Sequence, residues 1–338
     1  MLPVRLNPSA RMWRSGQFRI RNLVASQHNL ESCAGSPLVS LVVGSTGSTS
    51  SGSNHMPRRG LSSAPETTHQ RIKGRRRFYK EVTIRERHAE GGEEGSAKGE
   101  QSPGRRWEVL LDNRVLKTPA RRPLEFDTAD LAMAVAAEWD AQTSSKGIEP
   151  ALMPIMSLAS TAIDQVAFDR EKTISTCLKY LPTDTVCFLS PEPDPVITRR
   201  QRQLWSPLRE WSEETLGIPV VTTTEIHRKP EHPPEALVRA RDLLESLDEW
   251  ALSAVQSVTM ECKSLLIALA LVLRKTTVEK AFDAARLEEE YNVERWGMIE
   301  GGHDMDRANT TLTLTAASTL MWLRPITLSD NSSPGKLP

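Results

Sequence analysis

The chain has 338 residues, enough for one large domain or two medium ones with a hydrophobic core. Its 43 Lys and Arg residues are balanced by 43 Asp and Glu residues, so it lacks the basic surplus of a nucleic-acid-binding protein. The mean hydropathy of −0.40 excludes a polytopic membrane protein, and we expect no stable membrane insertion.

The first 30 residues predict a mitochondrial presequence. Their strongly basic residues are all arginines: Arg5, Arg11, Arg14, Arg19 and Arg21. The first acidic residue of the chain is Glu31. An Arg-rich, Ser-containing, acid-free segment is typical of such a presequence, whereas a secretory signal needs a continuous apolar stretch. A plain disordered basic tail is the alternative.

Two further segments are expected to be disordered. Residues 31–74 predict a linker, because most of this stretch is rich in Ser, Gly and Thr and shows no helical period. Residues 326–338 predict a tail. Ordered structure is therefore expected to begin near Arg75.

Strand signals follow Arg75. Residues 77–86 are β-branched and aromatic, with the alternation of a strand. Residues 107–119 predict two short strands around Asp112-Asn113, a pair that suits a tight hairpin turn. The Gly- and Glu-rich insert at 87–106 contains no phosphate-binding motif and predicts a loop at the tip of a hairpin.

From Asp127 onwards the apolar residues recur at helical spacing, with Pro and Gly between the periodic stretches. Helices are expected over 127–142, 154–168, 170–181, 196–216, 234–247, 249–274, 277–297 and 306–323. A short extended stretch is expected over 218–226. The apolar run at 265–273 is too short to span a bilayer, so it predicts a buried core helix.

These patterns predict an α+β fold. A small β-rich N-terminal domain is expected over residues 75–126, and a larger, all-α C-terminal domain over 127–325. The four cysteines form no C-x-x-C pair and no zinc motif, so they predict free thiols. The common hydrolase, metalloprotease and dinucleotide motifs are absent from the sequence.

Two acids stand out. Asp184 lies between a helix and a short apolar run. It could be a catalytic acid, but a turn or cap residue that accepts nearby backbone N–H groups is the favoured interpretation.

Glu289 is one of three consecutive glutamates. If 277–296 is one helix at about 100° per residue, Glu289 falls in the middle of an apolar stripe. That stripe is formed by Val278, Phe282, Ala285 and Trp296.

A carboxylate in an apolar stripe is costly unless it is paired or protonated. Three explanations for Glu289 are open. It could pair with an arginine such as Arg286 or Arg295. It could be a catalytic acid with a raised pKa. Alternatively, the stripe is a surface that binds another protein, and Glu289 contributes specificity there.

Seven ordered blocks resemble the mitochondrial ATP synthase assembly factor 2 family: RFYKEVTI, LLDNRVLKTP, AVAAEWDAQ, PIMSLASTAID, YLPTDTVCF, WSPLREWSEETLG and ARLEEEYNVERWG. The resemblance covers about residues 75–323. It implies a chaperone in the mitochondrial matrix whose partner is the alpha subunit of the catalytic head of ATP synthase. It also implies no catalysis, cofactor or metal.

The resemblance assigns the functional acid of the family to Glu289. It gives Trp139 as a second sensitive position, which we expect to be a core residue whose loss unfolds the domain. Asn292, Trp296 and Glu300 are expected as neighbouring partner-binding residues. This chain departs from the family pattern in having Asn292 where Gln is usual.

The expected function is therefore to hold the unassembled alpha subunit, prevent its aggregation and hand it over to the beta subunit. A small-molecule enzyme that uses Glu289 or Asp184 as acid or base is one alternative. A structural subunit of a mitochondrial complex is another.

Overall fold

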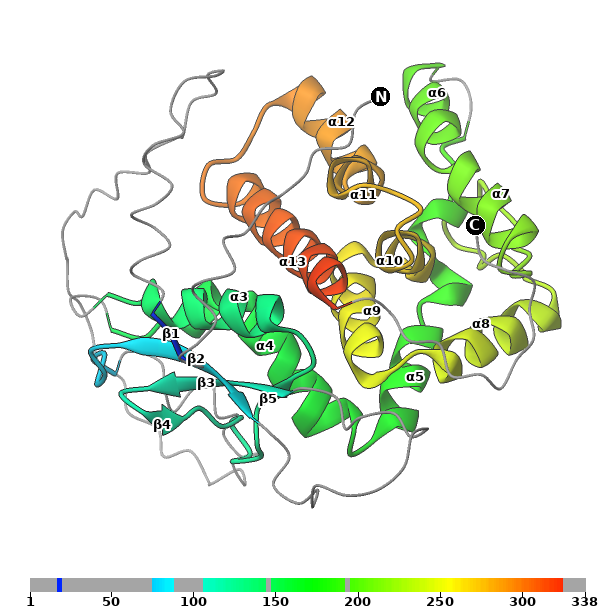
Figure 1. Ribbon diagram of the computed structural model, residues 1–338. Coiled ribbons are helices and arrows are strands. Elements are labelled where there is room, and N and C mark those ends of the chain that lie inside the picture. The colour runs from blue at the N-terminus through cyan, green and yellow to red at the C-terminus, as the bar shows by residue number, and fades with distance from the viewer. Residues whose placement is uncertain (1–16, 20–74, 88–105, 144–146, 192–194, 325–338) are drawn as a thin grey trace, which may run out of the picture.

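The structure is a computed structural model that describes residues 17–19, 75–87, 106–143, 147–191 and 195–324. Figure 1 shows a small sheet at one side and a larger group of helices at the other. The predicted linker, the predicted tail and almost all of the presequence and the 87–106 insert lie outside the described residues. The predicted α+β order, with strands first and helices after, is confirmed.

The sheet is antiparallel, in the order β1-β2-β3-β4, and β5 pairs with the other edge of β3. Its strands are β1 (Gln17–Arg19), β2 (Val82–Arg87), β3 (Arg106–Leu111), β4 (Arg114–Val115) and β5 (Glu125–Phe126). Asp112 and Asn113 have φ of 47° and 67°, so both adopt the left-handed conformation that a tight hairpin turn requires. The hairpin predicted at this dipeptide is confirmed.

The strand predicted from residue 77 begins only at Val82. The reason lies in the hairpin turn, where the carboxylate of Asp112 accepts the backbone N–H groups of Lys80 (3.0 Å) and Glu81 (2.9 Å). A side chain therefore satisfies donors that a longer strand would have paired with a neighbouring strand. Phe78 is exposed, as expected for a residue outside the sheet.

The helix α3 (Ala129–Asp140) packs between the sheet and other helices. The Thr128 hydroxyl accepts the N–H of Leu131 (3.3 Å) and caps its N-terminus. The helix packs on β2 and β3 with one side and contacts α4 and α13 as well. One continuous cluster of buried side chains extends from Tyr79 beside the sheet to Met321 near the C-terminus.

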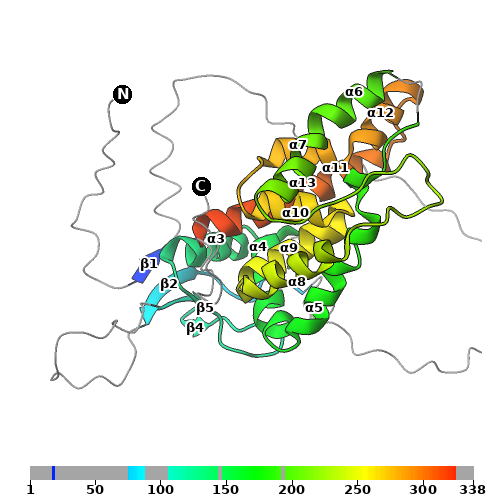
Figure 2. The ribbon, with the colours of Figure 1, turned by 90° about the vertical axis from the view of Figure 1, so that its right-hand side faces the viewer.

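The remaining α-helices form one group with α9 (Glu249–Cys262) and α10 (Leu265–Val272) at its centre (Figures 1 and 2). Around these two lie α4 (Pro154–Thr161), α5 (Arg170–Leu178), α6 (Pro195–Leu204), α7 (Ser206–Glu214), α8 (Pro234–Ser246), α11 (Val278–Ala285), α12 (Leu287–Trp296) and α13 (His303–Leu323). All residues of α10 are buried, which confirms the predicted core helix. None of the described helices is both long enough and apolar enough to cross a membrane.

Three predicted long helices are each divided into two. The 196–216 helix breaks at Trp205, and α7 begins at Ser206 with Pro207 in its first turn. The 249–274 helix breaks at Lys263, whose φ is 54°, and the Ser264 hydroxyl caps α10. The 277–297 helix breaks at Arg286, with φ −107° and ψ 13°. Each break changes the direction of the chain. The helical phase before a break therefore does not predict which side chains after it are buried.

Candidate functional site

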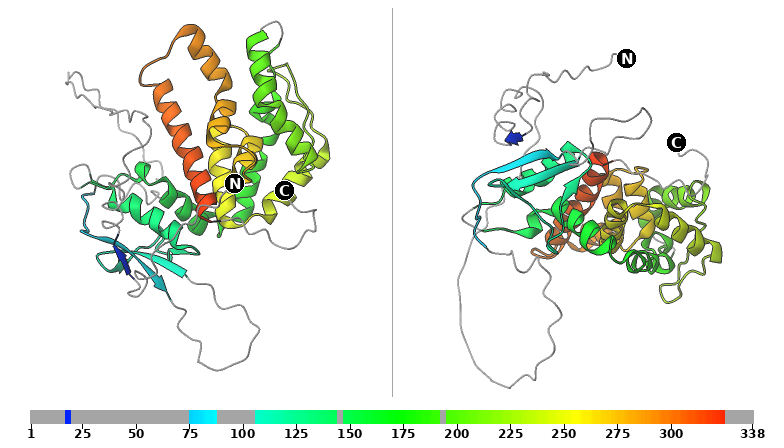
Figure 3. Two further views of the ribbon diagram at one scale, coloured as in Figure 1. Left: turned by 45° about the horizontal axis from the view of Figure 1, so that its top comes forward. Right: turned by 60° about the horizontal axis from the view of Figure 1, so that its bottom comes forward.

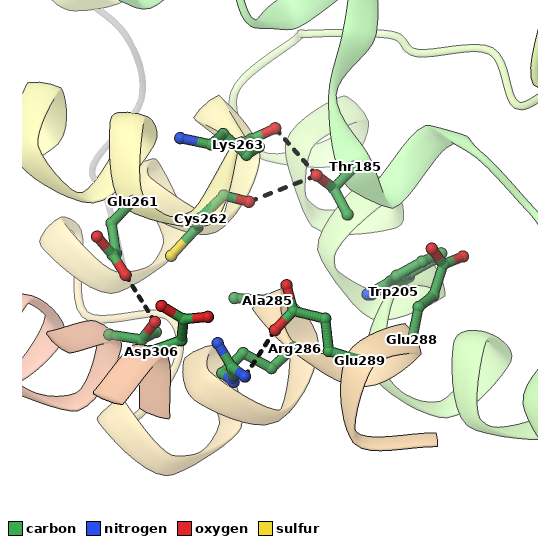
Figure 4. Close-up of a pocket in the computed structure, with 11 residues that line it drawn as sticks. Thr185, Trp205, Glu261, Cys262, Lys263, Ala285, Arg286, Glu288, Glu289 and Asp306 are labelled. Carbon is green, nitrogen blue, oxygen red and sulfur yellow. Dashed lines mark hydrogen bonds and ion pairs between the residues drawn. The ribbon is translucent and has the colours of Figure 1, made fainter. Parts of the chain in front are cut away.

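A pocket of about 350 Å³ lies where the α11–α12 junction meets the end of α9 and the first turns of α13. Figure 4 shows its side chains. It is lined by Thr185, Trp205, Glu261, Cys262, Lys263, Ala285, Arg286, Glu288, Glu289, Asp306 and Thr310. Glu289 is the one predicted partner-binding residue that belongs to this pocket.

The prediction that Glu289 falls in the middle of one apolar stripe with Val278, Phe282, Ala285 and Trp296 is wrong. The break at Arg286 changes the helical phase, and in α12 the buried residues are Leu287 and Tyr291. The side chain of Glu289 is 58% exposed, and its carboxylate lies 2.7 Å from Nη2 of Arg286. Pairing with Arg286, one of the three explanations open from the sequence, is therefore what the structure shows.

Arg286 is the buried charge of the site, with a side chain only 6% exposed. Its Nε donates to Glu290 (3.3 Å), and Nε of Arg307 donates to the same carboxylate (2.8 Å). Arg307, and to a smaller extent Arg286, lower the pKa of Glu290. Nη2 of Arg286 is buried, and although it lies close to Glu289 it makes no hydrogen bond of acceptable geometry with any described residue.

Three other carboxylates of the pocket have no basic partner within the described part of the chain: Glu261, Glu288 and Asp306. Glu261 accepts the Thr310 hydroxyl (2.6 Å), and Glu288 accepts Nε2 of Gln201 (3.2 Å), so both are held by neutral donors. Glu288 is exposed as a whole residue, but partial burial raises the pKa of its carboxyl group.

Asp184 lies close to the pocket wall but is fully buried. It accepts the Ser264 hydroxyl (2.6 Å) and the N–H groups of Leu266 (3.0 Å) and Val186 (3.3 Å). Burial raises its pKa to about 6, although these hydrogen bonds lower it. The carboxylate thus joins the start of α10 to the turn at 185–187, which is the capping role that the sequence favoured.

Apolar side chains are exposed around the connection between α12 and α13. This connection lies at an end of the helical part that points away from the sheet (Figure 3, left). Trp296 is 75% exposed, and Met298, Ile299 and Met305 are exposed beside it. Asn292 and Glu300 are exposed in the same region. Trp296 was expected to share a stripe with Val278 and Phe282, but the break at Arg286 directs it to solvent.

Trp139 belongs to a different part of the molecule. It is buried in α3, its ring packs edge-on against Tyr79 (5.7 Å between centroids), and its carbonyl accepts the Tyr79 hydroxyl (2.6 Å). It therefore fastens α3 to the segment that precedes β2. This placement agrees with the expectation that Trp139 is a core residue, and its sensitivity to substitution stays a prediction.

Three lining residues of the pocket had no signal in the sequence: Glu261 of α9, Lys263 at its C-terminal end and Asp306 of α13. No spacing rule relates these positions to Glu289, because only the packing of α9, α12 and α13 brings them to one pocket. Their carboxylates are dispersed over the wall. No three His, Cys, Asp or Glu side chains of the described residues are placed so that they could hold a metal ion.

Of the cysteines, Cys177, Cys187 and Cys262 are buried free thiols, as predicted. Burial raises the pKa of Cys262 to about 12, so the thiol that borders the pocket is protonated at neutral pH. It is a poor nucleophile in that form. Cys33 lies outside the described residues.

Comparisons with known proteins agree on one family. A family model described as "ATP12 chaperone protein" matches residues 76–213. A Schizosaccharomyces pombe protein named "Protein atp12, mitochondrial" is 31% identical over 226 residues, covering 63% of this chain and 76% of that protein. The Saccharomyces cerevisiae "Protein ATP12, mitochondrial" is 26% identical over 239 residues, covering 59% and 73%.

A solved structure supports the same family. The crystal structure of Atp12 from Paracoccus denitrificans aligns with a TM-score of 0.62 and 29% sequence identity, covering 74% of this chain and 98% of that one. Sequence and fold comparisons thus agree on the family. The chain belongs to the ATP12 chaperone family.

Proposed function

We propose that this protein is an assembly chaperone of the mitochondrial matrix. It would bind the unassembled alpha subunit of the ATP synthase catalytic head, prevent its aggregation and release it to the beta subunit. Membership of the ATP12 chaperone family supports this function, and two relatives that are named mitochondrial support the compartment.

The observation that carries the proposal is the exposed apolar surface of Trp296, Met298, Ile299 and Met305 next to the pocket of Glu289. An unassembled subunit exposes apolar surface that it later buries, and such surface aggregates. A chaperone that covers it must also release it. A surface that mixes apolar and charged groups is suited to this task, because polar pairs contribute specificity more than affinity.

The acid–base alternative has less support. The carboxylate of Asp184 already accepts three hydrogen bonds, and the carboxylate of Glu289 is already paired with Arg286. An active site would instead present a second titrating group aimed at a common reacting atom. The proposed function therefore includes no catalytic step.

The experiment is a pull-down of free alpha subunit from matrix extract with the wild type and with Glu289→Ala. We expect the variant to capture about tenfold less alpha subunit, as for the loss of a central recognition residue. Glu171→Ala is the matched control, because Glu171 is also an exposed acid that pairs with an arginine, Arg241 (2.9 Å), but lies on α5. Thermal melts should show that all three proteins are folded.

Two outcomes of the pull-down would contradict parts of this proposal. If Glu289→Ala captures as much alpha subunit as the wild type, Glu289 is an internal ion-pair residue and the recognition surface lies elsewhere. If the wild type captures none, the proposed function is wrong. A structural subunit would instead remain in finished ATP synthase, where a chaperone should be absent.

A further inference from the structure

We propose that the pocket receives one basic side chain, Arg or Lys, from the protein that the chaperone binds, here called the client. An apolar side chain of the same client segment would rest on Trp296. This inference rests on the proposed function and adds the chemistry by which the client is recognised.

The charge of the pocket is the first reason. Its wall carries four carboxylates, Glu261, Glu288, Glu289 and Asp306, against two basic groups, Arg286 and Lys263. Arg286 is already neutralised by Glu289, and Nζ of Lys263 donates to the carbonyl of Met260 and is turned away from the cavity in Figure 4. Three carboxylates therefore face the pocket without a basic partner from the described residues.

Helix stability explains only part of this arrangement. Glu288 lies in the first turn of α12 and Asp306 in the first turn of α13, where the helix dipole favours negative charge. The helix dipole does not explain why the first turns of α12 and α13 line the same cavity. It also does not explain Glu261, which lies near the C-terminal end of α9. Convergence of acids from three helices concentrates negative potential inside the pocket.

The shape of the pocket is the second reason. A cavity of about 350 Å³ has room for a long side chain. Its acids are too dispersed to enclose a metal ion, as found above for the described residues. Figure 4 shows Glu261 and Asp306 on one side of the Arg286–Glu289 pair and Glu288 on the other. A guanidinium or ammonium group on a flexible stem could reach between such separated carboxylates.

The third reason indicates a protein segment. The apolar side chains of Trp296, Met298, Ile299 and Met305 are exposed beside the pocket. A small cation would use only the acids of the pocket, whereas a segment that carries a basic and an apolar side chain would use both surfaces.

The exposed apolar surface continues from this pocket. Glu289 and Trp296 are seven positions apart on α12, so they lie within about 20° of each other and about 10 Å apart along the helix axis. Met305 directly precedes Asp306 in α13. The client's basic and apolar side chains should therefore lie about 10 Å apart on one face of the bound segment.

The test measures the affinity for purified alpha subunit at several salt concentrations, with the double variant Glu288→Gln/Asp306→Asn. Both substitutions keep size and an acceptor oxygen but remove the charge. We expect binding to weaken by about tenfold at low salt and its salt dependence to become shallower. The Trp296→Ala variant should also weaken binding but keep the wild-type salt dependence, because it removes only apolar contact.

The matched control is Glu235→Gln/Asp242→Asn, which removes the same charge from two exposed acids on α8. It should bind like the wild type. If the pocket variant is folded by thermal melt and binds with wild-type affinity and salt dependence, this inference is wrong while the proposed function stands. If the wild type does not bind alpha subunit at all, both are wrong.

Discussion

At the scale of single residues, the two conspicuous acids of the sequence have opposite surroundings. Asp184 is fully buried and accepts three hydrogen bonds, whereas Glu289 is exposed and makes one ion pair at the mouth of a pocket. A buried, fully engaged carboxylate contributes to the stability of the fold. An exposed carboxylate beside apolar residues is available to a partner. The two acids should therefore respond differently to substitution.

Asp184→Asn should lower the free energy of unfolding by about 1–3 kcal/mol, because the amide presents N–H where the carboxylate accepts donors. Urea unfolding of the purified protein measures this. The folded variant should capture alpha subunit as well as the wild type does. Ser264→Ala removes one of the donors and should cost less, about 1 kcal/mol. A stable Asp184→Asn variant that fails to bind would show that Asp184 takes part in recognition.

At the scale of elements, α3 and α4 are joined by a carboxylate. Glu138 of α3 accepts the N–H groups of Ile155 (2.7 Å) and Met156 (2.8 Å) at the N-terminus of α4. These donors have no partner within their own helix. Burial raises the pKa of Glu138 from 4.5 to about 7, although the two hydrogen bonds lower it. The link between the helices should therefore depend on pH.

The sign follows from the pKa of Glu138. The pKa of Glu138 is higher in the folded protein than in the unfolded chain. The contribution of the protonated Glu138 carboxyl group to the free energy of unfolding is therefore complete below pH 4.5 and is lost as the pH rises through about 7. Its size is up to about 3 kcal/mol. Glu138→Gln should lack this contribution, so its difference in unfolding free energy from the wild type should change between pH 5 and pH 8. Urea unfolding at both pH values measures it, and an unchanged difference would contradict the assignment.

At the scale of the whole molecule, the end of α13 fastens the helices to the sheet-bearing part. Arg324 forms ion pairs with Asp127 (2.9 Å), which precedes α3, and with Asp248, which caps α9. Its guanidinium also lies over the ring of Trp250, 5.3 Å from the centroid. The Thr128 hydroxyl donates to the carbonyl of Leu323 (2.8 Å). Three segments far apart in sequence thus meet at one arginine.

Arg324→Ala should destabilise the protein by about 3 kcal/mol, because it leaves the mostly buried carboxylate of Asp248 without a counter-charge, whereas Asp127 keeps its ion pair with Arg106. Hydrogen exchange should increase first at the C-terminal turns of α13. The control is Arg228→Ala, which removes an ion pair with Glu231 in which both side chains are mostly exposed. It should change stability by less than about 1 kcal/mol. Equal effects of the two substitutions would contradict the role of Arg324.

Local patterns in the sequence determined the order of strands and helices and several local features of this fold. The alternation at residues 77–86 and the helical period after Asp127 specified the α+β order, since each pattern depends only on near neighbours. Asp112-Asn113 specified a tight turn because both residues tolerate positive φ. The apolar run at 265–273 specified the buried α10, and the ordered blocks specified the family.

Only the tertiary structure decided the site. The helical phase can be projected along a sequence only while the helix is continuous. The break at Arg286 therefore placed Glu289 and Trp296 on the exposed side of α12 instead of in one stripe with Val278 and Phe282. The sequence contains no local signal for that break, since Arg286 is a good helix former. Likewise, Glu261 and Asp306 meet Glu289 through the packing of α9, α12 and α13. Contacts between distant segments depend on the fold as a whole, so no short stretch of sequence encodes them.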